Sequence, residues 1–234
     1  MEELASQAFW LGLAKIIGVN IILSGDNAVV IALAARSLPP RQQRRAIRWG
    51  AGAAVLMRIV LTAFAVALLA LPWLKLAGAV LLLWIGVKLL MPVAAADETR
   101  ASDNLVAAIR TILVVDVVMS LDNVIAVAAA AGGDWVLLMI GLAISIPLVI
   151  FGATLLVNVM ERFPVVITIG AALIGFVAGE MAWEDRAIIS VTRMHPQAFK
   201  YALATLCAAF VVVMGQWLAQ RAASRIAAPQ HPAR

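Results

Sequence analysis

The sequence predicts an all-α polytopic membrane protein with seven transmembrane helices, six of them forming a 3+3 inverted-topology repeat and the seventh additional. Two observations support this: an extreme apolar composition and a polar motif that occurs twice. Of 234 residues, 64% are hydrophobic and 13% are charged, and the mean hydropathy is +1.01. Soluble domains hold about 45–50% apolar and about 25% charged residues. Seven spans of about 20 residues leave little chain for anything else, so we expect one integral membrane domain over 1–234.

Charge and cysteine content exclude several classes of protein. A sequence pI near 10.1 would suit a nucleic-acid-binding protein. The basic residues fall between apolar runs, however, where they report membrane orientation, and we expect no nucleic-acid partner. The single cysteine, Cys207, lies in an apolar run, which excludes an internal disulfide framework and a cysteine-rich metal site.

Seven apolar runs, separated by turn residues and charges, predict the helices. Their ranges are 9–35, 49–71, 74–91, 105–131, 136–157, 164–183 and 199–219. The first run ends before Pro39-Pro40 and a group of arginines, and the second ends at Leu71-Pro72. Pro147 is expected to kink the fifth helix, and Phe163-Pro164 precedes the sixth.

The distribution of Lys and Arg predicts the orientation of the chain. The connection after the first helix is rich in arginine: Arg36, Arg41, Arg44, Arg45 and Arg48. An excess of Lys and Arg in a short connection marks the cytoplasmic side. We therefore expect a multi-pass protein of the bacterial cytoplasmic (inner) membrane, with its N-terminus outside and its C-terminus in the cytoplasm.

An internal repeat relates the two halves of the chain. A shift of 96 positions aligns four polar pairs: Asn20 with Asp116, Ser24 with Ser120, Asp26 with Asp122, and Asn27 with Asn123. A shift of 92 aligns Gly78 with Gly170. Each unit, about 8–91 and about 104–183, holds three helices, an odd number that inverts the second unit. Such repeats are typical of secondary transporters, whose sites lie near the midplane at the repeat interface. The helix at about 199–219 lies outside the repeat.

The ionisable residues inside the predicted spans are the candidate site. A charge at the centre of a membrane helix costs at least about 2.5–3.5 kcal/mol, so it normally faces a partner, water or the bundle interior. Carboxylate and amide oxygens are ligands for Mg²⁺, Ca²⁺ or Mn²⁺. The candidate metal ligands are Asp26, Asn27, Asp116, Asp122 and Asn123, and the secondary candidates, metal-binding or structural, are Asn20, Ser24 and Ser120.

Helical geometry leaves two arrangements open. Asp116, Ser120 and Asn123 share one stripe of a regular helix, whereas Asp122, like Asp26 in the first copy, points about 100° away. Either the two aspartates face a different neighbour, or the helices unwind at the motifs so that all these side chains converge.

Three further charged residues have open roles. Arg58 is a candidate gate, or a counter-ion that neutralises an aspartate when no metal is bound, which would give an exchange cycle. Glu180, aligned with Lys88, is a candidate gate or a solvated rim charge. Asp116 has no carboxylate twin, since it aligns with Asn20, and it is a candidate ligand or proton carrier.

The two copies of the motif, Ser24–Asn27 and Ser120–Asn123, resemble those of the TerC family, and the short chain is similar to its YjbE-type branch of metal-transport proteins. The resemblance covers about 8–219. It implies kinship with three-plus-three inverted-repeat exporters, which include lysine exporters, and an association with manganese export and tellurite resistance. It also implies that Asp26, Asn27, Asp122 and Asn123 bind the metal ion in transit. The residues alone reach only a hard-cation site; manganese comes from the resemblance.

We therefore expect a Mn²⁺ exporter that works by alternating access, with Mn²⁺ as its substrate, no permanently bound cofactor and no enzymatic activity. A lysine-type basic amino acid exporter is the first alternative. An intramembrane aspartyl protease is remote, because the single tyrosine, Tyr201, does not precede an aspartate. A structural partner of metalloenzymes also remains open. Proton coupling and a homodimer are open, and the lipid bilayer is the expected surrounding.

Overall fold

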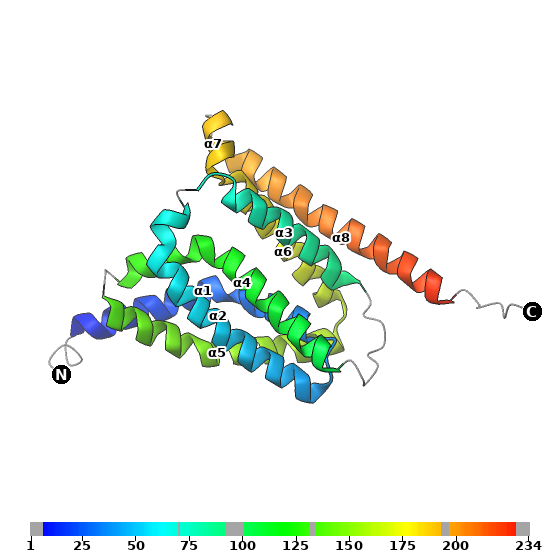
Figure 1. The fold of residues 1–234 in the computed structure, drawn as a ribbon, viewed down its shortest axis with the longest axis horizontal. Helices are drawn as coiled ribbons and strands as arrows, with labels where there is room; N and C mark the ends of the chain where they lie inside the picture. Colours follow the sequence, from blue (N-terminus) through cyan, green and yellow to red (C-terminus); the bar gives the residue numbers. More distant parts are fainter. Residues whose placement is uncertain (1–6, 70, 92–100, 132–133, 193–196, 228–234) are drawn as a thin grey trace, which may run out of the picture.

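The computed structural model describes residues 7–69, 71–91, 101–131, 134–192 and 197–227 (Figure 1). Within these ranges it does not describe the side chains at 7–9, 12, 15–16, 19–24, 65–69, 101–103, 121–122, 124–131, 135, 137, 191–192, 223 and 225–227. The described part of the chain forms eight helices: α1 (Gln7–Ala35), α2 (Pro40–Leu69), α3 (Leu74–Leu90), α4 (Ala101–Ala131), α5 (Trp135–Arg162), α6 (Val165–Trp183), α7 (Arg186–Thr192) and α8 (Gln197–Ala227).

The all-helical prediction is confirmed for the described residues, and each predicted range falls mainly within one long helix. Only α7, with 7 residues, was not predicted. Four segments are long and apolar enough to cross a membrane: Pro40–Phe64, Leu138–Arg162, Val165–Trp183 and Gln197–Ala222. These four lie within the described part of the chain, and both α1 and α4 also contain side chains that the structure does not describe. Seven spans and the inverted repeat therefore stay predictions.

The start of α2 corrects one boundary. The helix begins at Pro40 rather than at 49, so four arginines assigned to the connection lie on its first turns: Arg41, Arg44, Arg45 and Arg48. Proline suits the first position of a helix, where its missing N–H is not needed. The carbonyl of Pro39 accepts hydrogen bonds from the backbone N–H groups of Gln42 and Gln43. Arginine is also a good helix former, so its charge marks a water-facing surface rather than the end of a helix.

The long helices form two groups. In one, α1 packs against α4 and α5, and α2 packs against the same two helices; in the other, α3, α6 and α8 pack against one another. Figure 1 shows the second group beside the first. The groups meet where α1 and α5 contact α6 and where α3 contacts α4. The predicted repeat relates α1 to α4, α2 to α5 and α3 to α6. Under that relation, the contact between α1 and α5 corresponds to the contact between α4 and α2, and both are present.

The apolar core lies between these helices, and large apolar side chains also cover the outside. Leu33, Ile47, Leu82, Ile112 and Ile174 are almost completely buried. Large hydrophobic side chains elsewhere are exposed, among them Leu56, Phe151, Leu206 and Val213. Exposed apolar surface of this extent suits a surrounding of lipid.

Two glycines bring α6 and α8 into close backbone contact. A Cβ at Gly179 would lie 2.5 Å from Ala204 Cα, and one at Gly175 would lie 2.9 Å from Ala208 Cα. Small residues four apart on facing helices permit such close approach in membranes. No side chain larger than hydrogen fits at either glycine without separating α6 from α8.

Asp185 links the end of α6 to the start of α3. Its side chain is buried, and its Oδ1 accepts hydrogen bonds from the backbone N–H groups of Trp73 (3.0 Å) and Ala187 (2.8 Å). Its Oδ2 accepts one from Leu76 (3.1 Å). Helix N-termini leave N–H groups without partners, which such a carboxylate satisfies. Burial raises the pKa of Asp185, but these backbone hydrogen bonds outweigh it and hold the pKa below its usual value.

Candidate functional site

The first motif copy lies on an unbroken part of α1. Asp26 is half-buried, its Oδ1 lies 2.7 Å from the backbone N of Asn27, and the Asn27 side chain is buried. The helix continues through these residues because the apolar segment that follows, including Val30 and Ile31, packs into the core. Both α1 and α4 are continuous helices over their motifs. The alternative in which the helices unwind there is therefore wrong.

The second motif copy places polar groups on successive turns of α4. Asp116 and Ser120 are both buried, and Ser120 Oγ donates a hydrogen bond to Asp116 Oδ2 over 3.3 Å. Asn123, one turn further on, is half-buried. The stripe predicted for these three residues thus points into the packed interior at Asp116 and Ser120.

Arg58 reaches this stripe from α2. Its side chain is 5% exposed, and its Nη2 lies 2.9 Å from Asp116 Oδ1. Its Nε donates a hydrogen bond to Ser120 Oγ over 3.1 Å. Asp26 lies half-buried on α1, which packs against α4. The fold therefore pairs a charge on α2 with one on α4 in its interior, where Arg58 neutralises Asp116.

A buried ion pair of this kind gives little net stability. The cost of removing two ions from water roughly cancels their attraction, and apolar replacements are often neutral or stabilising. Ionisable groups inside membrane segments normally mark a functional site. The Arg58–Asp116 pair is therefore a better indicator of function than of folding.

The structure does not assemble the whole predicted ligand set. The side chains of Asn20, Ser24 and Asp122 lie outside the described residues. Among the described side chains, no group of three or more His, Cys, Asp or Glu residues is placed to hold a metal ion. The metal-binding roles of Asp26, Asn27, Asp116, Asp122 and Asn123 stay predictions.

Glu180 belongs to a separate set of ion pairs at the end of α6. Its Oε1 lies 3.2 Å from Lys200 Nζ. Glu184 contacts the same ammonium at 2.6 Å and Lys75 Nζ at 3.3 Å. These pairs join α6 to the starts of α3 and α8. The sequence alone does not identify Glu184, Lys75 and Lys200 as partners in these ion pairs. The only indication in the sequence is that each is a charged residue at or next to the end of a helix.

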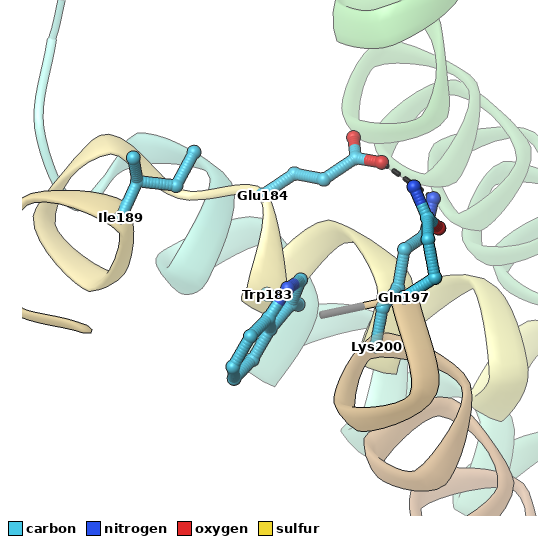
Figure 2. Close-up of a pocket in the computed structure, with 5 residues that line it drawn as sticks. All are labelled: Trp183, Glu184, Ile189, Gln197 and Lys200. Carbon is cyan, nitrogen blue, oxygen red and sulfur yellow. Dashed lines mark hydrogen bonds and ion pairs between the residues drawn. The ribbon is translucent and has the colours of Figure 1, made fainter. Parts of the chain in front are cut away.

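A pocket of about 130 Å³ lies beside these ion pairs. Figure 2 shows its lining residues, with Glu184 reaching across to Lys200: Trp183, Glu184, Ile189, Gln197 and Lys200. Burial raises the pKa of Glu184, but the hydrogen bond from Lys200 and the charge of Lys75 outweigh it, and the pKa lies below its usual value. The carboxylates and ammonium groups here form ion pairs with one another, as expected of charges that hold neighbouring helices together.

Comparison with known proteins places this chain in a family. The sequence profile described as "Integral membrane protein TerC family" matches residues 5–223, which include both motif copies. The chain belongs to the TerC family. Its integral membrane character follows from that membership, and the predicted resemblance is confirmed.

Bacterial relatives support the assignment. This TerC family chain is 42% identical over 205 residues to the uncharacterized membrane protein YjbE of Bacillus subtilis (strain 168), covering 88% of this chain and 94% of that protein. It is 25% identical over 191 residues to the uncharacterized membrane protein YceF of the same strain, covering 77% and 74%. It is 28% identical over 174 residues to the inner membrane protein YgdQ of Escherichia coli (strain K12), covering 66% and 73%. No solved structure matches the chain.

Proposed function

We propose that this TerC family protein exports Mn²⁺ across the bacterial cytoplasmic membrane by alternating access around a site on α1 and α4. The observation that supports this most directly is the buried carboxylate of Asp116, which holds a cationic group inside an apolar helix bundle. A site that stabilises one cation there can stabilise another. Manganese itself is suggested by the resemblance of the two Ser-x-Asp-Asn motifs to manganese exporters.

The charges of the predicted site suit a divalent cation. Asp26, Asp116 and Asp122 carry three negative charges and Arg58 carries one positive charge, so the set has an excess of two negative charges. One Mn²⁺ would neutralise that excess, whereas a monovalent cation would leave one charge uncompensated inside the membrane, at a cost of a few kcal/mol. Asn27 and Asn123 follow the aspartates directly and offer amide oxygens, which Mn²⁺ also accepts.

The helix contacts support the repeat that this mechanism needs. The α1–α5 and α2–α4 pairings correspond under exchange of the two halves, as do the α1–α6 and α3–α4 contacts. Repeats of this kind place the substrate site where the halves meet and move one group of helices against the other. The motif helices α1 and α4 contact each other, and the two groups described above are candidates for the moving parts.

One contact brings the ends of α1 and α3 to the same side of the membrane, as the proposed topology requires. Arg36, directly after α1, donates a hydrogen bond from its Nη2 to the backbone carbonyl of Leu89 near the end of α3, over 2.8 Å. The ends of α1 and α3 therefore lie together, beside the arginines that begin α2. If that arginine-rich end faces the cytoplasm, the N-terminus lies outside.

A basic amino acid is the second candidate substrate. Asp116 already accepts a guanidinium on an alkyl chain, and an external lysine or arginine side chain carries the same kind of group. Competition separates the candidates: excess lysine should leave Mn²⁺ transport unchanged if Mn²⁺ is the substrate, and should suppress it if both share the site.

The function is tested by manganese tolerance and content in a manganese-sensitive host. Cells would express the wild type, Asp26→Asn, Asp122→Asn or the control Glu161→Gln, with membrane levels matched. Glu161 is an exposed carboxylate near the end of α5, so its variant removes one charge away from the motifs. We expect the wild type and the control to lower cellular manganese and both aspartate variants to fail. Unchanged manganese in the wild type would contradict the proposal.

A further inference from the structure

Arg58 occupies the carboxylate that a metal ion would need. Its Nη2 contacts Asp116 Oδ1 at 2.9 Å, while Ser120 Oγ contacts Asp116 Oδ2 at 3.3 Å. Both carboxylate oxygens therefore already accept hydrogen bonds. Hard divalent cations bind oxygen at about 2.0–2.6 Å, closer than the guanidinium lies. Each oxygen keeps a second lone pair that could face a metal ion. A divalent cation bound there would, however, lie close to the guanidinium, and repulsion between the two cations in low-dielectric surroundings favours withdrawal of Arg58.

We propose that Arg58 is a tethered cation, which occupies Asp116 when the transport site is empty and withdraws when the metal ion binds. This inference rests on the proposed function. Arg58 then acts in one step of the transport cycle, the return of the empty protein. The arginine and the metal ion are alternative partners of the Asp116 carboxylate.

The low-dielectric surroundings explain why Asp116 needs a cationic partner when the empty protein returns. Asp116 and Arg58 are both nearly completely buried. An empty site with an unneutralised Asp116 would carry a buried charge through the conformational change, which is costly inside a membrane. With Arg58 in place, the return requires no counter-transported proton to neutralise Asp116. Net efflux should then move the charge of the metal ion and follow the membrane potential.

The movement proposed for Arg58 leaves the helix intact. Thr62 Oγ1 donates a hydrogen bond to the backbone carbonyl of Arg58 over 2.7 Å, and α2 is continuous from Pro40 to Leu69. The long, flexible arginine side chain therefore has to move its guanidinium away from Asp116 without unfolding α2.

The test uses the full-length protein in vesicles loaded with Mn²⁺. Net efflux into manganese-free buffer requires the empty protein to return, whereas exchange of internal for external Mn²⁺ does not. In Arg58→Gln we expect net efflux to fall by roughly tenfold or more and exchange to stay within about twofold of wild type. Mn²⁺ should also bind roughly tenfold more tightly, because its competitor is gone.

Two further variants control for charge and folding. Arg48→Gln removes an exposed arginine from the same helix, and we expect wild-type net efflux. Arg58→Lys keeps a cation beside Asp116, so net efflux should recover relative to Arg58→Gln. If Arg58→Gln does not fold, wild-type vesicles supply the test: an inside-positive potential should accelerate net efflux, and a pH gradient should leave it unchanged.

The outcomes separate the inference from the proposed function. Wild-type protein that supports neither net efflux nor exchange of Mn²⁺ contradicts the function, and the inference with it. Wild-type transport with equal loss of net efflux and exchange in folded Arg58→Gln contradicts the inference alone. So does wild-type net efflux that follows the pH gradient and ignores the potential.

Discussion

Nη2 of Arg58 on α2 and Oδ1 of Asp116 on α4 lie 2.9 Å apart with their side chains only 5% and 6% exposed. The two residues are 58 positions apart in the sequence. Their pairing places a charge-neutral polar contact inside an apolar bundle. The proposed transport site and the proposed cycle both depend on this contact.

Breaking the pair should destabilise the protein more than removing it. Asp116→Leu leaves a buried guanidinium without its carboxylate, which should cost about 3–5 kcal/mol, whereas Arg58→Met combined with Asp116→Leu should cost much less. Urea unfolding in detergent micelles, followed by circular dichroism, measures both. Additive losses in the double variant would mean that the two side chains do not interact in the folded protein.

The close contact between α6 and α8 predicts a sharp response to size. In Gly179→Val the new side chain meets the backbone of Ala204, whose Cα lies 2.5 Å from the Cβ position. Such overpacking should cost about 1–3 kcal/mol or more. Thermal unfolding in detergent measures the loss.

Gly52→Ala is the matched control for that experiment. A Cβ at Gly52, inside α2, meets nothing within 4 Å. Alanine favours helix over glycine by about 0.5–1 kcal/mol, so this variant should be as stable as wild type or slightly more stable. Equal losses at Gly52 and Gly179 would contradict the close α6–α8 packing.

Asp185→Ala should loosen the start of α3. The change removes the acceptor for the N–H groups of Trp73 and Leu76, and loss of such a cap typically costs about 1 kcal/mol. Faster amide hydrogen exchange in the first turn of α3 would report it. Asp134→Ala is the comparison: that carboxylate caps α5 at an exposed position, so any loosening should be confined to α5.

The same carboxylate predicts a dependence on pH. The pKa of Asp185 in the folded protein lies below its unfolded value of 3.8. Its stabilising effect should therefore be complete above the unfolded pKa and disappear as the pH falls through the folded pKa. Stability of wild type minus that of Asp185→Asn, measured at several pH values below neutral, should shrink only at the acid end. A difference that grows with acidity would contradict the lowered pKa.

The sequence predicted the features that depend on neighbours along the chain. Long apolar runs require burial or lipid, so the positions of the long helices follow from these runs and from the turn residues and charges between them. The start of α2 does not follow from the apolar pattern, because its first turns are rich in arginine, which is polar but compatible with helix. The short α7 has only 7 residues, too few for a membrane span, and the backbone N–H of Ala187 in its first turn donates a hydrogen bond to Asp185.

Pairings between distant helices could not be predicted from the sequence. Arg58 was recognised as a counter-ion candidate, but only the packing of α2 on α4 assigns it to Asp116. Glu180 was recognised as an ionisable residue, but its contact with Lys200 depends on how α8 lies on α6. Nothing local in the sequence marks Asp185 as the partner of Trp73, 112 positions earlier.

The distance of 112 positions between Trp73 and Asp185 has a consequence for the synthesis of the protein. A ribosome produces α3 well before it reaches Asp185, so the newly inserted α3 begins with amide groups that the finished protein satisfies from the far end of α6. Chains that stop before Asp185 retain that exposed helix start. The start of α3 is therefore completed only after the whole of α6 has been made.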